Sequence, residues 1–182
     1  MRTTISIQTK WVIDPMHSEV QFKVRHLMIS TVTGSFQKFS GTAITESEDF
    51  EDAEIQFSID VNSISTNQTM RDNHLKSADF FQTEKYPTID FKSTSFKKIN
   101  DTDYALVGNL TMKGVTKEVA VNAAFGGESK DLQGNLKAGF EITGTINRKD
   151  FGLTYNALTE TGGLALSENI KLIANIQVAK QS

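Results

Sequence analysis

The chain has 182 residues, with 19 basic and 22 acidic side chains and a formal net charge of −3. This length suffices for one domain with a substantial core, and the balanced charge without a basic cluster argues against a general nucleic-acid-binding protein. Cysteine is absent, which excludes a disulfide framework, a thiolate nucleophile and a zinc–thiolate site.

Alternating apolar and polar residues in the first part of the chain predict β-strands that are buried on one face. The apolar face of residues 19–28 contains Val20, Phe22, Val24, His26 and Met28, and that of residues 54–61 contains Ile55, Phe57, Ile59 and Val61. Residues 32–45, which include Phe36, are also strand-like, but their two faces are similar and stay unassigned. The acidic run at 46–54 lacks the calcium-loop pattern and predicts a solvated hairpin tip.

Residues 67–81 interrupt the alternation. Side chains recur at intervals of four, four and three residues at Met70, His74, Ala78 and Phe81, with Leu75 beside them. This spacing predicts one stripe on a short amphipathic helix. Because the stripe must cover something apolar, we expect the helix at the end of the sheet system, either as a plug that completes the core or as a lid over a ligand.

Polar residues near the start of this segment indicate how the helix begins. The side chain of Thr66 or Asn67 can accept a hydrogen bond from the first turn, which predicts an N-cap at one of them. Arg71 and Asp72 fall outside the stripe, where they can face water or anchor the helix to the rim of a barrel.

The alternation resumes at Pro87 and continues almost to the end of the chain. The apolar faces contain Ile89 and Phe91; Tyr104, Leu106, Leu110 and Met112; Val119, Val121, Ala123 and Phe125; Leu136, Ala138, Phe140, Ile142, Ile146 and Arg148; and Ile170, Leu172, Ala174, Ile176 and Val178. Turn signals near 112–115, 126–134 and 159–169 separate these runs, and the short connections require antiparallel neighbours.

The pattern as a whole predicts an all-β fold of about eight antiparallel strands. Closing such a sheet into an up-and-down barrel removes its edges and leaves room for one small ligand, while a two-sheet sandwich is the competing architecture. Several segments are longer than the usual strand, which favours the barrel. The interior is either a packed core or an open tube; glycines within the strands leave room for the tube, at Gly34, Gly41, Gly108, Gly139 and Gly144.

Four motif regions occur in order between Trp11 and about Val178. Residues 11–36 contain D-P-x-H-S, F-x-V-x-H and S-T-V-x-G-x-F; residues 71–93 contain R-D-x-H-L-x-S-x-D-F-F and Y-P-x-I-x-F; residues 110–119 read L-T-x-x-G-V-T-x-x-V; and residues 146–153 contain I-N-R-x-D-F-G. The chain therefore resembles the YceI-like, polyisoprenoid-binding family. The resemblance implies a lipocalin-like, eight-stranded antiparallel barrel with one short inserted helix, enclosing a long isoprenoid chain such as a quinone tail or a polyprenyl lipid.

The residues expected to contact this lipid share the apolar faces of the strands and the helix. They are Phe22, Val24, His26, Phe36, Phe57, Ile59, Met70, His74, Leu75, Phe81, Phe91, Leu106, Leu110, Phe140, Ile142, Arg148 and Leu172. His26 is interpreted as a satisfied core residue or as a polar contact to the head group. A buried Arg148 needs a carboxylate, carbonyl oxygens or an anionic ligand as its partner. If the strand continues, Asp150 lies on the same face and is the expected partner, and recognition of a phosphate is the alternative.

The favoured function is non-enzymatic binding of an isoprenoid lipid, for carriage, storage or sequestration. One alternative is an enzyme that acts on such a lipid, with His26 as acid or base and Arg148 as an anion holder. Another is a packed barrel that acts through its surface, for example as a homodimer. We expect no nucleic acid, metal or cofactor, since no Gly-rich phosphate loop, G-x-S-x-G or H-E-x-x-H motif occurs.

Residues 1–182 are expected to form a single domain, because no linker or low-complexity stretch divides them. No segment approaches the roughly 20 apolar residues of a membrane span. The first residues lack the apolar run of a signal peptide, so a cytoplasmic location is expected.

Overall fold

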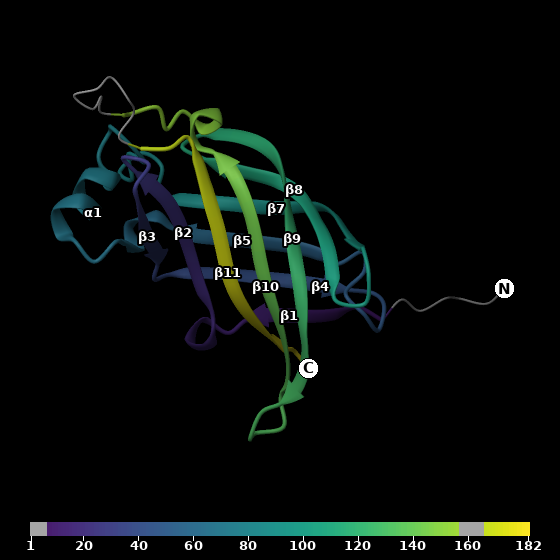
Figure 1. Ribbon diagram of the computed structural model, residues 1–182. Helices are drawn as coiled ribbons and strands as arrows, with labels where there is room; N and C mark the ends of the chain where they lie inside the picture. Colours follow the sequence, from purple (N-terminus) through teal and green to yellow (C-terminus); the bar gives the residue numbers. More distant parts are fainter. Residues whose placement is uncertain (1–6, 157–165) are drawn as a thin grey trace.

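Strands make up most of the structure, a computed structural model that describes residues 7–156 and 166–182 (Figure 1). The strands are β1 (Thr9–Ile13), β2 (Glu19–His26), β3 (Ser30–Phe36), β4 (Phe39–Thr45), β5 (Glu54–Asp60), β6 (Ile64–Ser65), β7 (Thr88–Lys98), β8 (Asp103–Met112), β9 (Val115–Lys130), β10 (Leu136–Asn147) and β11 (Asn169–Lys180). The described helices are α1 (Thr69–Lys76) and the 3-10 turns η1 (Pro15–His17), η2 (Val61–Ser63) and η3 (Arg148–Phe151). The turn predicted at 159–169 lies largely outside the described residues.

Eight of the strands close into an antiparallel barrel, in the order β1-β4-β5-β7-β8-β9-β10-β11. The barrel closes where β1 pairs with the end of β11, with Trp11 opposite Lys180 and Ile13 opposite Val178. The predicted eight-stranded antiparallel barrel with one short inserted helix is therefore confirmed. Closure pairs each of these eight strands with two neighbours over part of its length, which limits pairing with other chains.

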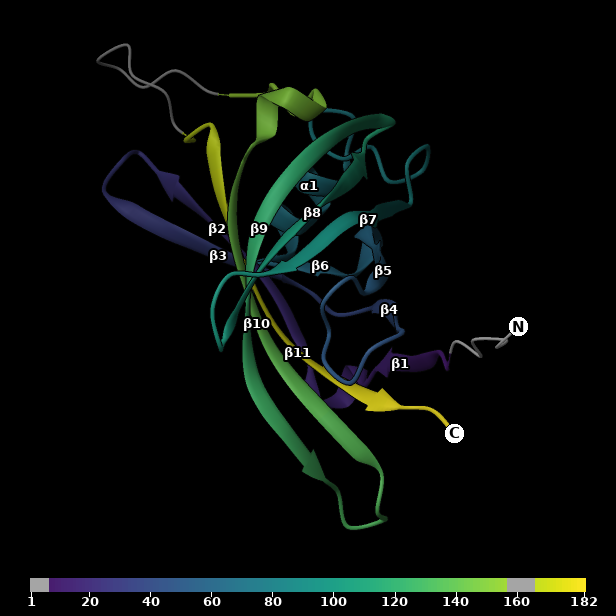
Figure 2. The ribbon, with the colours of Figure 1, turned by 90° about the vertical axis from the view of Figure 1, so that its right-hand side faces the viewer.

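The β2–β3 hairpin breaks the simple up-and-down order. β11 is longer than β1, and its first half pairs with β2 instead, with Lys171 opposite Lys23. The turn η1 separates β1 from β2, so the two strands share one partner in succession. β3 then pairs with β6 through only two residue pairs, and Figure 2 shows the hairpin projecting from the barrel wall.

The tip of this hairpin differs from the predicted pattern. β2 ends at His26, and both Leu27 and Met28 have positive φ, so they form the turn. Met28 is exposed, and its expected place on the apolar face is wrong because strand parity ends with the strand. Residues 32–45 form parts of two strands, β3 and β4, which follow each other across a bend at 37–38 without pairing; Phe36 and Ala43 are among their buried residues.

Helix α1 is shorter than predicted, and it is rotated relative to the predicted stripe. Met70 is 85% exposed, and Ala78 lies beyond the end of the helix and is exposed. Leu75 instead packs against the barrel core. Within the described part of the chain, no helix is long and apolar enough to cross a membrane.

Contacts with Thr66 explain this rotation. The Arg71 Nε donates to Thr66 Oγ1 at 2.7 Å, and Arg71 Nη2 donates to the Thr66 carbonyl at 2.7 Å. Asp72 Oδ1 accepts hydrogen bonds from both the Thr66 amide, at 2.8 Å, and the Thr66 hydroxyl, at 2.6 Å. These bonds turn the face of Arg71 and Leu75 toward the barrel. Arg71 and Asp72 thus anchor the helix, whereas the predicted N-cap is wrong because Gln68 takes that position.

Candidate functional site

A cavity of about 650 Å³ runs inside the barrel. Its lining includes Phe36 and Leu75 near α1, and Phe96 and Val178 near the opposite end. The volume lies within the range of about 300–1,000 Å³ that is typical of small-molecule sites. Side chains of Phe, Ile, Leu and Val dominate the lining. The sequence left open whether the interior is a packed core or an open tube, and the structure shows an open tube.

Phenylalanine rings in the tube lie against glycines of neighbouring strands. A Cβ added at Gly34 would lie 2.1 Å from Cζ of Phe22, and one added at Gly108 would lie 2.4 Å from Cζ of Phe91. The space over these two glycines is therefore filled by rings, contrary to the expectation that it belongs to the tube. Because the rings lie close to the backbone of the wall, the axis of the barrel stays open.

Most polar residues that line the cavity gather at the end that carries α1, on the left of Figure 1. They are His26, Thr66, Gln68, Arg71, His74, Arg148 and Tyr155. Three more polar lining residues belong to the strands of the wall, namely Gln21, Thr42 and Gln56. The tube is therefore asymmetric, with a polar mouth at one end.

Arg148 is the most deeply buried charged group of this mouth, with 3% of its surface exposed. Its Nε donates to the Ser167 carbonyl at 2.9 Å, and its Nη1 donates to the carbonyls of Leu153 at 2.6 Å and Tyr155 at 2.8 Å. Its Nη2 is buried and has no hydrogen-bond partner among the described residues. Burial lowers the pKa of Arg148, partly opposed by the charge of Glu168.

The predicted pairing of Arg148 with Asp150 is wrong. β10 ends at Asn147, and Arg148 begins the turn η3, so Asp150 no longer follows the parity of the strand and is exposed. The nearby Glu168 forms an ion pair with Lys149, with 2.9 Å between Glu168 Oε1 and Lys149 Nζ. Backbone carbonyls therefore take the place of the expected carboxylate, and they leave the positive charge of Arg148 without a direct ion pair among the described residues.

His74 connects α1 to the segment after η3. Its ring makes edge contacts with Phe80 at 5.1 Å and Tyr155 at 5.0 Å, and its Nε2 lies 2.9 Å from Oδ2 of Asp79. His26 lies across the mouth at the end of β2, where it forms a backbone bridge with Leu166. Because His26 is exposed and lines the mouth, its interpretation as a core residue is wrong.

Phe50 closes the opposite end of the tube. It comes from the connection between β4 and β5, is 3% exposed and lines the cavity. Its ring centroid lies 5.0 Å from that of Trp11, 5.9 Å from that of Phe125 and 4.9 Å from that of Phe140. The sequence predicted a solvated tip here; Phe50 is the lone aromatic residue within the acidic run, which is the signal that could have identified it.

Comparison with known proteins identifies the family. Residues 11–178 match the YceI-like domain family. A UPF0312 protein of Staphylococcus aureus strain N315 is 38% identical over 170 residues, which cover 93% of this chain and 96% of that protein. The chain belongs to the YceI-like family. The resemblance inferred from the four motif regions is thus confirmed.

Solved structures share the YceI-like barrel. A Campylobacter jejuni YceI protein is 33% identical with a TM-score of 0.74, covering 88% of this chain and 91% of that chain. BcnA from Burkholderia cenocepacia is 20% identical with a TM-score of 0.79, covering 91% and 98%. A polyisoprenoid-binding domain from Saccharophagus degradans, implicated in plant cell wall breakdown, is 17% identical with a TM-score of 0.69, covering 94% and 98%. At identities of 20% and 17%, the last two support the fold alone.

The YceI-like tube brings together almost every residue that the sequence placed in it. All of the predicted contact residues line the cavity except Met70, which points into solvent. Lining residues that the prediction missed include Phe50 and Tyr155, which lie outside regular strands. Among the described residues, no group of His, Asp and Glu side chains could hold a metal ion.

Proposed function

We propose that this YceI-like barrel binds a long-chain isoprenoid lipid, of the polyprenyl or quinone type, for carriage, storage or sequestration. The observation that carries the proposal is the asymmetric tube, which is apolar along its length and polar at one end. A solved barrel of the same fold is a polyisoprenoid-binding domain, and the proposal carries that ligand class over to this chain. Such a ligand also combines a long apolar tail with a polar head.

Removal of the tail from water supplies the affinity. Apolar surface contributes about 25 cal/mol for each Å² that leaves water, less the cost of ordering a flexible chain. The wall holds the tail through side chains without formal charge, among them Phe57, Leu106 and Leu172. The interactions along the tail are therefore non-directional, and a family of related tails can share the site.

The head group lies at the mouth in this proposal. Arg148 holds a buried positive charge there, and its Nη2 needs an acceptor. A carbonyl or phosphate oxygen of a lipid head supplies one after a small shift of the side chain. His26 and His74 flank the same opening and offer further polar contacts. The tail then runs along the barrel toward Phe50.

Membership of the YceI-like family and the form of the tube indicate binding rather than catalysis. Arg148 is engaged in holding the fold, since its Nε and Nη1 donate to three backbone carbonyls. The alternative of a solid barrel that acts through its surface does not account for a cavity of about 650 Å³.

Blocking the tube tests the proposal. Ala174 lines the cavity from β11, and the adjacent Asn175 is exposed on the outer face of the same strand. Ala174→Trp places an indole in the tube, whereas Asn175→Trp adds the same group outside it. Lipid extracted from each purified protein is identified by mass spectrometry. We expect isoprenoid lipid from the native protein and Asn175→Trp, and a loss of at least about tenfold in Ala174→Trp. Equal recovery from both variants, or no isoprenoid from the native protein, contradicts the proposal.

A further inference from the structure

One residue from a loop, Phe50, joins strand residues such as Phe96 and Phe140 in lining the closed end of the tube. Phe50 projects from the β4–β5 connection into the barrel, where its ring packs between those of Trp11 and Phe140. Trp11 and Phe140 belong to strands of the wall. The depth of the tube is therefore set by how far one side chain enters it.

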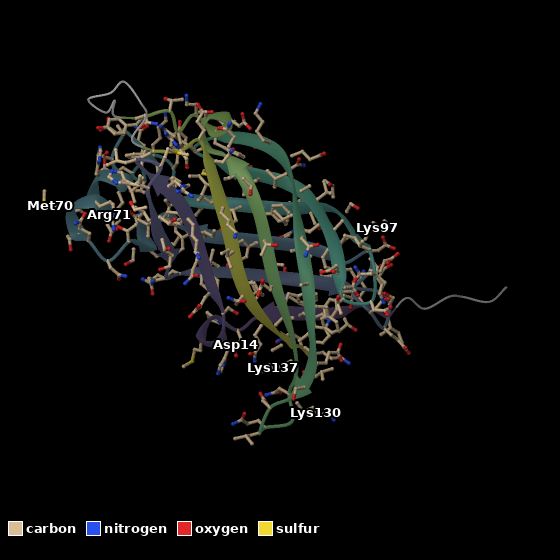
Figure 3. The ribbon with its side chains drawn as sticks, viewed as in Figure 1. Asp14, Met70, Arg71, Lys97, Lys130 and Lys137 are labelled. Atoms are coloured by element: carbon tan, nitrogen blue, oxygen red, sulfur yellow. The ribbon has the colours of Figure 1, made fainter. Side chains whose placement is uncertain are left out.

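Hydrogen bonds fasten this loop to β7. The Asp52 amide donates to the Phe96 carbonyl at 2.8 Å, and Glu51 Oε2 accepts from the Lys98 amide at 3.1 Å. Lys97 pairs with the Asp52 carboxylate. Figure 3 shows Lys97 at the opposite end of the barrel from Arg71, which belongs to the mouth. Phe50 is thus held in place at the end of the tube farthest from the polar mouth.

We propose that Phe50 determines the longest isoprenoid tail that the tube accepts. This inference rests on the proposed function, in which the head is held at the mouth and the tail extends inward. Each added isoprene unit strengthens binding as long as that unit fits inside the tube, because its apolar surface then leaves water. Once the tail reaches the Phe50 ring, a further unit must fold back or stay in water, and binding stops improving. Phe50 is therefore the specificity-determining residue for tail length.

The chain contains a single tryptophan, and it lies beside this end of the tube. Trp11 fluorescence therefore reports when a tail reaches Phe50, while calorimetry measures affinity. Lipid-stripped full-length protein is titrated with geraniol, farnesol, geranylgeraniol and longer polyprenols. For the native protein we expect affinity to rise with tail length to a maximum, and Trp11 emission to change only near that length.

Variants at the closed end then test whether Phe50 sets the preferred tail length. Phe50→Ala is expected to move the maximum to longer tails, by one isoprene unit or more. Phe125→Ala is the matched control, because it removes the same ring from the same aromatic cluster but lies outside the cavity lining. Its preferred length is expected to stay unchanged. Phe50→Leu, which retains an apolar side chain in the loop, is expected to give a smaller shift in the same direction.

The outcomes separate this inference from the function on which it rests. If the native protein binds no member of the series, the proposed function fails. If it binds them with a maximum that is the same in Phe50→Ala, the tube binds lipid but Phe50 does not set the length. If circular dichroism shows that Phe50→Ala is unfolded, Phe50→Leu decides, and an unshifted maximum in that variant overturns the inference.

Discussion

The Asp14 carboxylate, directly after the end of β1, accepts three hydrogen bonds. The donors are the Met16 amide at 3.1 Å, His17 Nδ1 at 2.8 Å and Lys137 Nζ at 3.0 Å. The hydrogen bonds of His17 and Lys137 lower the pKa of Asp14 from 3.8 to about 2. Figure 3 shows Asp14 beside Lys137, so this carboxylate joins the η1 turn to β10.

A depressed carboxyl pKa stabilises the fold where the carboxylate is charged. The contribution of Asp14 is therefore present above the unfolded pKa of about 4 and is lost as pH falls toward about 2. We expect Asp14→Asn to lower the free energy of unfolding by about 1–2 kcal/mol at pH 7, after allowance for partial exposure. Urea unfolding of both proteins between pH 7 and pH 2 measures this difference. A difference that stays constant down to pH 2 would assign the effect to something other than charge.

Gly34 provides a second test on a single residue. A methyl group there collides with the Phe22 ring, which must swing into the tube. We expect Gly34→Ala to reduce bound lipid while it lowers stability by about 1–3 kcal/mol. Gly139→Ala is the control, since its added methyl meets no described atom within 4 Å. Lipid content per protein, measured after extraction, should fall for Gly34→Ala alone; an equal fall in both would point to a general strand effect.

At the scale of elements, only one face of helix α1 contacts the barrel. Leu75 packs on the core at the mouth, whereas Met70 on the same helix is exposed. We expect Leu75→Asp to lower lipid retention severalfold, because a carboxylate at the mouth replaces apolar contact with the tail. Met70→Asp should retain lipid as the native protein does. Circular dichroism should keep its β signature in both, and global unfolding of Leu75→Asp would show that the helix is a plug of the core.

The helix and the Phe50 loop also show where sequence patterns stop being informative. Alternation predicted which strand residues face inward, because the pleat of a strand is a local property. The rotation of α1 is set by bonds between its first turn and Thr66, which no periodicity encodes. The inward turn of Phe50 depends on the fastening of its loop to β7. Interactions between elements decided both features.

At the scale of the molecule, local patterns predicted the barrel but not its strand order. Short connections specify antiparallel neighbours, so most hairpins follow directly from the turns. The pairing of β2 with β11 joins distant parts of the chain, and it follows from the greater length of β11 relative to β1. The tube was predictable only through family resemblance, because an inward apolar face suits a packed core equally well.

Bound lipid should stabilise the whole barrel, since it binds the folded state alone. At a free ligand concentration of about 100 times Kd, we expect about 2.7 kcal/mol of added stability. Denaturant unfolding of lipid-loaded and lipid-stripped protein measures it. Phe140 lines the cavity at the closed end, so Phe140→Ala should cost about 3–5 kcal/mol in the stripped protein and less in the loaded protein, where lipid can fill the space left by the ring. Identical midpoints for loaded and stripped native protein would argue against lipid inside the barrel.

The pairing of β11 with both β1 and β2 also affects folding during synthesis. β11 follows β1 and β2 in the chain, so the edge of β1 that meets β11 stays unpaired until Lys180 has been synthesised, and the corresponding edge of β2 until Lys171. Pairings between such distant residues form slowly, because the entropy of closing a long loop is lost before the contacts are gained. During synthesis, β1 and β2 therefore present open edges that can pair with other nascent chains. Chaperones that shield strand edges are most valuable to this protein in that interval, before its last strand arrives.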